Sequence, residues 1–188
     1  MLKLKRPKNP IIIVSGLHGV GKSTYAMPLA REFKLQYVST GSVFRSMAKE
    51  RGVTVAQFSE ISMRSPEFDR EIDKVTLSLL DTGGAVLDSL LAGWFAKDFE
   101  SFKIFLKAPF EVRCRRIAAR ENRPLEEVVS ETLAREESER KRFMDYYGFN
   151  ISDLSLYDMV LETGGLSQES VSRILKTAVR TYLEEKWW

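Results

Sequence analysis

The fold is decided by one stretch, IIIVSGLHGVGKSTYAMPLA, which covers residues 11–30. It opens on an all-apolar run, residues 11–14, typical of a parallel strand that is buried on both faces of a sheet. The run leads into G-x-x-x-x-G-K-S, residues 16–23, which is the spacing of a phosphate-binding P-loop. A helix is expected to start at the loop, and Pro28 is tolerable only in about its first turn. Strand, glycine loop and helix in this order predict a site for the phosphates of a nucleotide.

Each part of this loop suits an anion. Glycines let successive backbone N–H groups point into one concavity, and the following helix adds the positive end of its dipole. Lys22 can neutralise the β- and γ-phosphates, and the Ser23 hydroxyl suits a Mg²⁺ ion that bridges them. The residues expected to hold the nucleotide are Gly16, Leu17, His18, Gly19, Val20, Gly21, Lys22, Ser23 and Thr24. The alternative, a glycine turn that binds nothing, does not account for strand, loop and helix in register.

The composition limits the class of protein. A chain of 188 residues, 44% hydrophobic and 29% charged, fits one soluble globular domain. The net charge of +3 is too small to indicate nucleic acid by itself, and the single cysteine, Cys114, excludes an intramolecular disulfide. No apolar run approaches the length of a membrane span, and the basic opening MLKLKRPKNP precedes too short an apolar run for a signal peptide. A cytoplasmic protein with a solvated basic leader is expected, although the leader could also touch RNA or an anionic surface.

Strand-like and helix-like segments alternate along the rest of the chain. Strands are expected at residues 11–14, 35–40, 85–88, 102–108 and 158–163, with helices in most of the intervals and at residues 168–186. Gly41 is expected to end the second strand, and Ser42 to cap the next helix. The alternation predicts an α/β fold, a doubly wound five-stranded parallel sheet in three α/β/α layers. The site should lie beyond the carboxyl ends of the strands.

Phosphoryl transfer needs positive charge around the transferred group, so arginines near strand ends are candidates. Arg45 follows a strand end within STGSVFR, and its alternative is an exposed surface arginine. Arg135, Glu139 and Arg142 are spaced i, i+4, i+7 and share one helical face, where the carboxylate could hold both guanidinium groups. The alternative is a solvated helix with internal ion pairs.

Four further residues carry weaker signals. Asp88 ends a strand and could hold a Mg²⁺-bound water, or it could cap a helix. Asp69 and Asp73 form an i, i+4 pair that could reach a base or sugar, although a solvated face is the usual reason for such spacing. His18 is the only histidine, and its backbone is expected to matter rather than its ring. Cys114 is expected to be a structural thiol despite its arginine neighbours.

Nucleic acid is not indicated as a partner. Residues 111–147 carry nine basic and nine acidic side chains, so this helical region offers no net positive stripe. The balance favours local ion pairs over a groove for a polyanion.

With these residues identified, the chain resembles a nucleoside monophosphate kinase, and most closely the archaeal-type cytidylate kinases. The resemblance covers nearly the whole chain from residue 11. Its motifs are GLHGVGKST, STGSVFR, LAGW, REESERKRF and YGFNISDLSLYDMVLET. Many kinases share the first motif, whereas the combination of LAGW with the last two is much more specific.

The resemblance implies a single P-loop kinase domain with a helical monophosphate-binding insert at about residues 39–80 and a short lid at about residues 120–142. A monomer is expected. It implies transfer of the ATP γ-phosphate to CMP or dCMP with Mg²⁺, giving the diphosphate and ADP. Catalytic roles fall on Lys22, Arg135, Arg142 and Arg120, and acceptor binding on Thr40, Arg45, Asp69, Asp73 and Glu139. Ser23 and Asp88 are the implied metal ligands.

The chain departs from the family pattern at two positions. Ser42 stands where many members have aspartate, and Leu90 where many have an arginine that contacts the acceptor. The second change bears on acceptor identity, so a kinase of AMP, UMP or a small-molecule hydroxyl is the nearest alternative. A protein that uses the same fold as an NTP-dependent switch in RNA maturation or assembly is the alternative from another class.

Overall fold

The computed structural model of the chain describes residues 4–188, and five parallel strands form its central sheet. The strands are β1 (Ile11–Ser15), β2 (Gln36–Ser39), β3 (Ala85–Asp88), β4 (Phe102–Lys107) and β5 (Met159–Glu162). Their order in the sheet is β2-β3-β1-β4-β5, and all neighbouring pairs are parallel. The central strands β1 and β3 are completely buried, which is why their sequences are continuous apolar runs.

Eight helices surround the sheet in the described residues. They are α1 (Lys22–Glu32), α2 (Thr40–Glu50), α3 (Val55–Ser62), α4 (Pro66–Thr82), α5 (Ala92–Phe95), α6 (Phe110–Glu121), α7 (Leu125–Tyr147) and α8 (Gln168–Lys186). None of them is long and apolar enough to span a bilayer.

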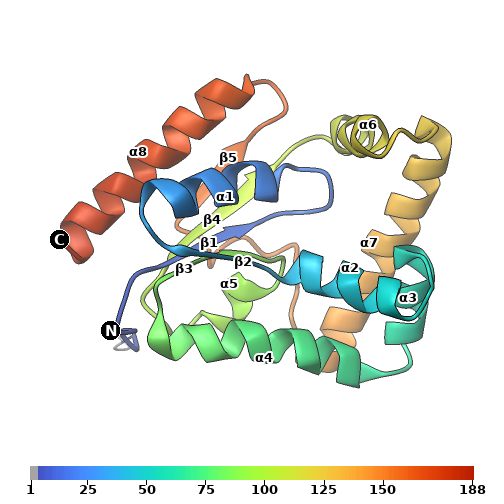
Figure 1. The fold of residues 1–188 in the computed structure, drawn as a ribbon, viewed down its shortest axis with the longest axis horizontal. Coiled ribbons are helices and arrows are strands. Elements are labelled where there is room, and N and C mark those ends of the chain that lie inside the picture. The colour runs from blue at the N-terminus through green and yellow to red at the C-terminus, as the bar shows by residue number, and fades with distance from the viewer. Residues whose placement is uncertain (1–3) are drawn as a thin grey trace.

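The sheet lies between two helical layers. Helices α1 and α8 cover one face, and α4 and α5 cover the other (Figure 1). Each face of the sheet has its own apolar core, and alternate residues of β1 pack into one core or the other, because successive side chains of a strand point to opposite faces. Ile12 and Val14 pack with α1 and α8, while Ile11 and Ile13 pack with α4 and α5. The expected three-layer α/β/α fold with a five-stranded parallel sheet is therefore confirmed.

The remaining helices gather at one end of the sheet. Helices α2, α3, α6 and α7 lie together beyond the carboxyl ends of the strands, at the right of Figure 1. A separate apolar cluster joins α2, α3 and α4 through Phe44, Met47, Phe58 and Ile72. A second cluster joins α6 to α7 through Cys114, Ile117 and Val128. These helices therefore have small cores of their own beside the main sheet.

The start of α2 differs from the expectation. Ser39 caps the helix, with its side chain accepting a hydrogen bond from the Ser42 backbone N–H at 3.3 Å, so Ser42 is not the cap. Gly41 lies inside the helix and does not end the strand. The reason is that Ser39 has extended backbone angles and a short hydroxyl side chain, so one residue both ends β2 and caps α2.

One further expectation is corrected at the edges of the fold, and another holds in part. Pro28 lies within α1 well past its first turn, in a helix whose Ala26 and Leu29 pack on the sheet; tertiary packing outweighs the lost hydrogen bond. In the described part of the basic leader the charged side chains of Lys5, Arg6 and Lys8 are exposed to solvent, as expected, but the backbone is paired with the segment after α5. The Lys5 backbone bonds to Asp98 O and to the Glu100 N–H, both at 2.8 Å.

Candidate active site

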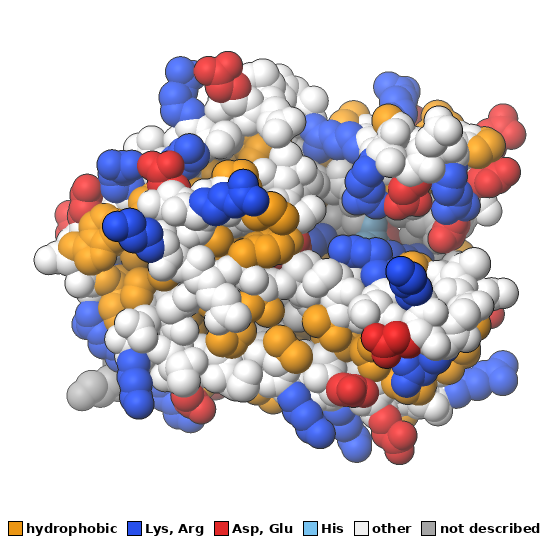
Figure 2. Space-filling model, in the orientation of Figure 1, with side chains coloured by type: hydrophobic (Ala, Val, Ile, Leu, Met, Phe, Trp, Pro, Cys, Tyr) orange, Lys and Arg blue, Asp and Glu red, His pale blue; other side chains and the backbone are white. Residues whose placement is uncertain are grey.

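A cavity of about 700 Å³ opens at the carboxyl ends of the strands. Figure 2 shows the surface hollowed on its right-hand side, between the lobe that carries α6 and the lobe that carries α2 and α3. Predicted site residues that line it are His18, Gly19, Val20, Gly21, Lys22, Ser23, Thr24, Thr40, Arg45, Asp69, Asp73, Asp88, Arg120, Arg135, Glu139 and Arg142. Leu90, at the position of the missing arginine, lines it as well. Gly16 and Leu17 are not among the lining residues, and their carbonyls face Lys22 instead.

The P-loop needs its glycines for physical reasons. Gly16 and Gly19 have φ angles of +145° and +76°, which L side chains rarely adopt. A Cβ at Gly16 would lie 2.5 Å from Leu106 O, and one at Gly19 would lie 2.5 Å from Arg113 O. The loop is therefore packed against β4 and α6 at distances that admit no side chain.

Lys22 lies folded back onto this loop. Its Nζ donates to Gly16 O at 2.6 Å and more weakly to Leu17 O at 3.4 Å. Burial lowers the pKa of Lys22 from its ordinary value, against the attraction of Asp88 and Glu139. The ammonium group stands at the mouth of the loop with carbonyl partners that an anion could replace.

Asp88 and Ser23 both line the cavity and carry oxygen donors of the kind that suits Mg²⁺. Asp88 is 4% exposed at the end of β3 and accepts a hydrogen bond from the Tyr37 hydroxyl at 2.9 Å. The cap of the following helix is Leu91, so Asp88 is not a helix cap. No group of three or more acidic, His or Cys side chains in residues 4–188 could hold a metal alone. One carboxylate and one hydroxyl fit a Mg²⁺ that completes its shell with water and phosphate oxygens.

Three arginines from different elements face this cavity. Arg45 comes from α2, Arg120 from the end of α6 and Arg135 from α7. The pKa of Arg45 is lowered by partial desolvation and then by the positive charges of Arg120 and Arg135, which line the same cavity. Arg45 and Arg120 are exposed, as the alternative for Arg45 anticipated, yet they line the cavity. Such a cluster stabilises an anion placed among them.

Glu139 lies on α7 between Arg135 and Arg142, but its partners are not both arginines. Its Oε1 accepts from Arg135 Nε at 3.1 Å, and its Oε2 lies 2.7 Å from His18 Nε2. Burial alone would raise the pKa of Glu139, but His18 and Arg135 outweigh burial and hold that pKa well below its usual range. The His18 ring, which was not expected to matter in the site, contacts this carboxylate.

Arg142 has a separate set of partners. It is 3% exposed, its Nε lies 2.7 Å from Asp69 Oδ2, and its Nη1 donates to Ser59 O at 3.2 Å. The pairing of Glu139 with Arg142 that the spacing predicted is therefore wrong. The reason lies in the tertiary structure. Helices α3 and α4 bring Ser59 and Asp69 against the C-terminal half of α7, and a pattern within the α7 sequence cannot indicate these contacts.

Asp69 and Asp73 are buried, so a solvated face is excluded for them. Asp69 pairs with Arg142, and Asp73 accepts a hydrogen bond from the Tyr147 hydroxyl. Burial is the main cause that raises the pKa of each carboxyl group to about 6. Both line the cavity on the side formed by α2 and α4. They offer acceptors in a partly apolar wall that includes Phe44 and Phe143.

The raised pKa of Asp73 predicts a pH dependence of stability. In the native state the Asp73 carboxyl group keeps its proton up to a pH of about 6, whereas the ordinary pKa of an aspartate side chain is 3.8. The free energy of unfolding should therefore fall as the pH rises through this window, since the native state binds the proton more tightly. Asp73→Asn removes the titration, so the melting temperature of the wild type minus that of Asp73→Asn should decrease between pH 4 and 6.5. Asp81→Asn, at an exposed position of the same helix, is the control. A difference that stays constant or rises with pH would contradict the assignment.

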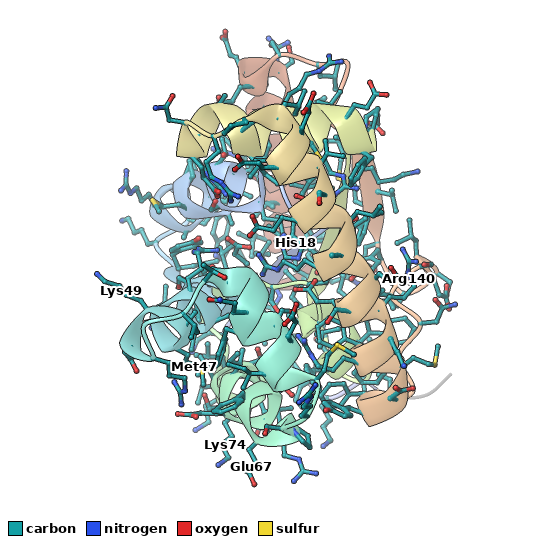
Figure 3. The ribbon with its side chains drawn as sticks, turned by 90° about the vertical axis from the view of Figure 1, so that its right-hand side faces the viewer. His18, Met47, Lys49, Glu67, Lys74 and Arg140 are labelled. Atoms are coloured by element: carbon teal, nitrogen blue, oxygen red, sulfur yellow. The ribbon has the colours of Figure 1, made fainter. Side chains whose placement is uncertain are left out.

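Sequence reasoning missed two residues that hold the site together. Arg113 of α6 donates to His18 O at 2.9 Å and pairs with Glu136 of α7, and both side chains are buried. The helix α7 faces the P-loop in Figure 3, where His18 lies near the middle of the view. A lapse of apolar periodicity at Glu136 was the available signal. It could not have identified Arg113, which lies 23 positions away.

Cys114 behaves as expected. It is fully buried between α6 and α7, and burial raises the pKa of its thiol despite the nearby Arg113. It is a structural thiol.

A parallel sheet of this order, with a P-loop after its central strand and arginines around one cavity, defines an enzyme of the P-loop kinase class. Solved structures agree on the fold. A shikimate kinase from Acinetobacter baumannii is similar with a TM-score of 0.59 at 18% identity, covering 95% of this chain and 96% of its own. A gluconokinase from Sinorhizobium meliloti reaches 0.63 at 11% identity, with 96% and 97% covered.

The chain belongs to the cytidylate kinase-like family, whose model matches residues 11–165. A cytidylate kinase from Aeropyrum pernix is 42% identical over 168 residues, which is 89% of this chain and 98% of that protein. Another from Pyrococcus horikoshii is 39% identical over 174 residues, covering 92% and 90%. The resemblance drawn from the motifs is therefore confirmed.

Proposed function

We propose that the protein transfers the γ-phosphate of ATP to CMP or dCMP, giving CDP or dCDP and ADP. The observation that carries the proposal is the convergence of Lys22, Arg45 and Arg135 on one cavity, in a chain whose curated relatives are cytidylate kinases. The charges converge where phosphates would meet. A single cysteine fits a cytoplasmic enzyme, and one chain supplies every residue assigned below, which fits a monomer.

The donor nucleotide would be bound by the loop after β1. Backbone N–H groups of residues 16–24 face its phosphates, and Lys22 neutralises the β- and γ-phosphates. Ser23 and Asp88 would hold a Mg²⁺ ion, which would supply positive charge against the phosphates. Arg135, with Arg120 as a weaker contributor at the entry to the lid, offsets the charge that spreads over the transferred group.

The acceptor would occupy the side of the cavity formed by α2 and α4. Thr40 and Arg45 bind its phosphate at the carboxyl end of β2. Asp69 and Asp73 accept hydrogen bonds from the base or sugar, and Arg142 is held beside them by Asp69. Arg142 is therefore assigned to the acceptor end rather than to the transferred phosphate, because Asp69 and Ser59 occupy it there.

This reaction does not require a general base. The second pKa of a phosphate monoester is about 6, so the attacking oxygen of the acceptor is already anionic near neutral pH. The chain accordingly has to position two nucleotides and exclude water. We assign these tasks to the helical insert, about residues 39–80, and to the lid, about residues 120–142.

The test is an ADP-release assay with Mg·ATP and CMP, dCMP, UMP, AMP or GMP, with a control that lacks acceptor. Turnover is expected with CMP and dCMP well above the control. Leu90 in place of an arginine removes one contact, which predicts an acceptor affinity weaker by roughly ten- to a hundredfold than that of a member with the arginine. Turnover with AMP or UMP alone would correct the acceptor, and hydrolysis stimulated only by RNA would overturn the proposal.

A further inference from the structure

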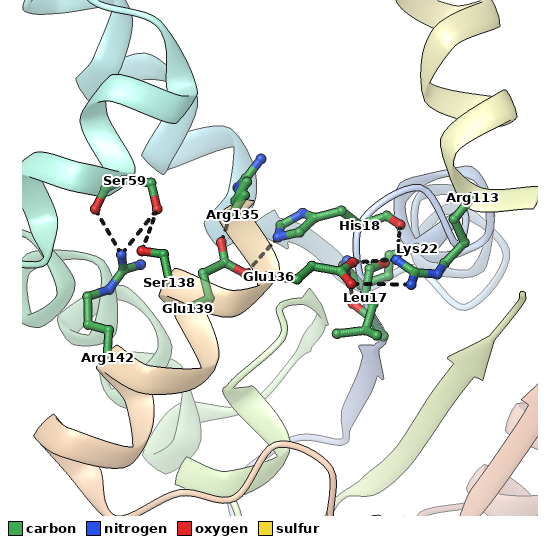
Figure 4. A network of polar contacts seen from close by, with 11 residues as sticks. Leu17, His18, Lys22, Ser59, Arg113, Arg135, Glu136, Ser138, Glu139 and Arg142 are labelled. Carbon is green, nitrogen blue, oxygen red and sulfur yellow. Dashed lines mark hydrogen bonds and ion pairs between the residues drawn. The ribbon is translucent and has the colours of Figure 1, made fainter. Parts of the chain in front are cut away.

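One residue of the P-loop, His18, is connected to α7 in two ways, directly through its ring and indirectly through Arg113 of α6. The His18 ring lies 2.7 Å from Glu139 Oε2, across 121 positions of sequence. The His18 backbone carbonyl accepts from Arg113 Nη1 at 2.9 Å, and Arg113 pairs with Glu136. Figure 4 shows both connections, which run from the loop to two carboxylates one turn apart on α7. A P-loop needs only backbone at this position, so the ring contact calls for a separate explanation.

The contact passes directly to Arg135. Glu139 uses one oxygen for the His18 ring and the other for Arg135 Nε at 3.1 Å. Glu139 is 5% exposed, so water does not compete effectively for its oxygens. Arg135 Nη1 and Nη2 make no hydrogen bond within residues 4–188 and belong to a side chain that lines the cavity. The His18 ring therefore holds the Glu139 carboxylate in place, and this carboxylate in turn orients the Arg135 guanidinium group.

The charges around the ring favour a neutral donor. Burial lowers the pKa of His18; Glu139 raises it, while Arg135 and Lys22 lower it further. Two further charged groups lie beside His18. Arg113, which donates to the His18 carbonyl, and Glu136 form a buried ion pair, so their opposite charges largely cancel at the ring. Near neutral pH the ring can donate its Nε2–H to the ionised Glu139 and add no charge of its own.

We propose that His18 is a positioning residue that docks α7 on the phosphate loop and, through Glu139, aims Arg135 at the transferring phosphate. The role rests on the proposed function, because it presumes phosphoryl transfer in this cavity. It goes beyond that function by giving a task to the side chain of a loop residue. The lid arginine would be oriented before any nucleotide binds, which lowers the cost of ordering it during catalysis.

The first test compares three variants of the ring. His18→Leu and His18→Asn cannot reach Glu139 with a donor, whereas His18→Gln places an N–H near the position of Nε2. The first two should lower kcat by about 10- to 100-fold with little change in the KM for ATP, and His18→Gln should regain most of the loss. Damage to the loop itself would instead raise the KM for ATP in all three. That pattern, or a wild-type kcat in His18→Leu and His18→Asn, would overturn the role.

The second test asks whether His18 acts through Arg135. In an Arg135→Ala background, His18→Leu should cause no further loss of kcat, because the group that it positions is gone. A loss of the same factor in both backgrounds would show that the ring acts independently of Arg135 and would overturn the proposal. Melting temperatures of all variants show whether each is folded, and His18→Asn serves if His18→Leu is not.

A third measurement does not depend on activity. The chain has one histidine, so the ring signals in an NMR titration belong to His18 without further assignment. Glu139→Gln should shift the ring pKa, since the charge that favours the protonated ring is lost. Glu137→Gln, the same change at an exposed position of α7, should not. Equal titrations in both variants would overturn the contact. A wild type inactive with every acceptor would refute the proposed function, and the catalytic role with it, while leaving an observed contact intact.

Discussion

Arg135→Ala is expected to lower kcat by about 10³-fold while the protein remains folded. The side chain is held at Nε by Glu139 and lines the cavity, so under the proposed function its truncation would remove positive charge beside the transferred phosphate. Arginines that act on this transition state contribute about 10³- to 10⁵-fold to kcat in phosphoryl transfer. Steady-state rates of ADP release with saturating ATP and CMP would measure the effect.

The control for this variant lies on the same helix. Arg140 is exposed and lies on the outer side of α7 in Figure 3, so Arg140→Ala should keep the wild-type rate. A near-normal kcat in Arg135→Ala would show that the lid assignment is wrong. A loss of melting temperature in Arg135→Ala alone would point to a structural role, because Arg135 also lies 5.6 Å from the ring of Phe44.

Lys22→Ala is expected to abolish most phosphoryl transfer, by about 10²- to 10³-fold in kcat. The ammonium group donates to two carbonyls of the loop, Gly16 O at 2.6 Å and Leu17 O at 3.4 Å, and Lys22 lines the cavity. A preorganised donor in a site of this kind contributes by stabilising charge that develops in the transition state. The change also removes a ligand of the β- and γ-phosphates, so ATP affinity measured by calorimetry should fall too.

Lys97→Ala, at an exposed position after α5, is the matched control and should retain both activity and ATP affinity. Lys22 has a pKa lowered chiefly by burial, so removing this partly desolvated cation should not reduce stability. An unfolded variant would contradict that reasoning, and a variant with full activity would refute the P-loop assignment.

Much of the fold could be predicted because its information is local. The five strands and the long helices follow from runs and periodicities within a few residues, and the alternation leaves few possible topologies. The P-loop was predictable for the same reason, since Gly16, Gly19 and Gly21 are required by the backbone itself. The helix start at Ser39 was misjudged by three residues because Ser39 and Ser42 carry equivalent hydroxyls. Only the extended conformation of Ser39 at the strand end distinguishes them.

The partners of the charged residues on α4 and α7 could not be predicted. Glu139 was expected between Arg135 and Arg142 from helical spacing, but it bonds to His18 from a loop 121 positions away. Asp69 and Asp73 have the spacing of a solvated face, yet α7 buries them with Arg142 and Tyr147. The charge pattern of one helix indicates which of its own side chains could form ion pairs. It does not indicate which side chains from other helices or loops will bind the same groups instead.

The primary structure therefore established the sheet, the phosphate loop, the family and many of the charged residues that line the cavity. These depend on backbone geometry and on hydrophobic periodicity, which operate over short distances along the chain. The choice of partner for each buried charge was made by the packing of α3, α4, α6 and α7 against the loop. A buried charge must be neutralised by whatever tertiary structure brings within about 3 Å, so its partner depends on the whole fold.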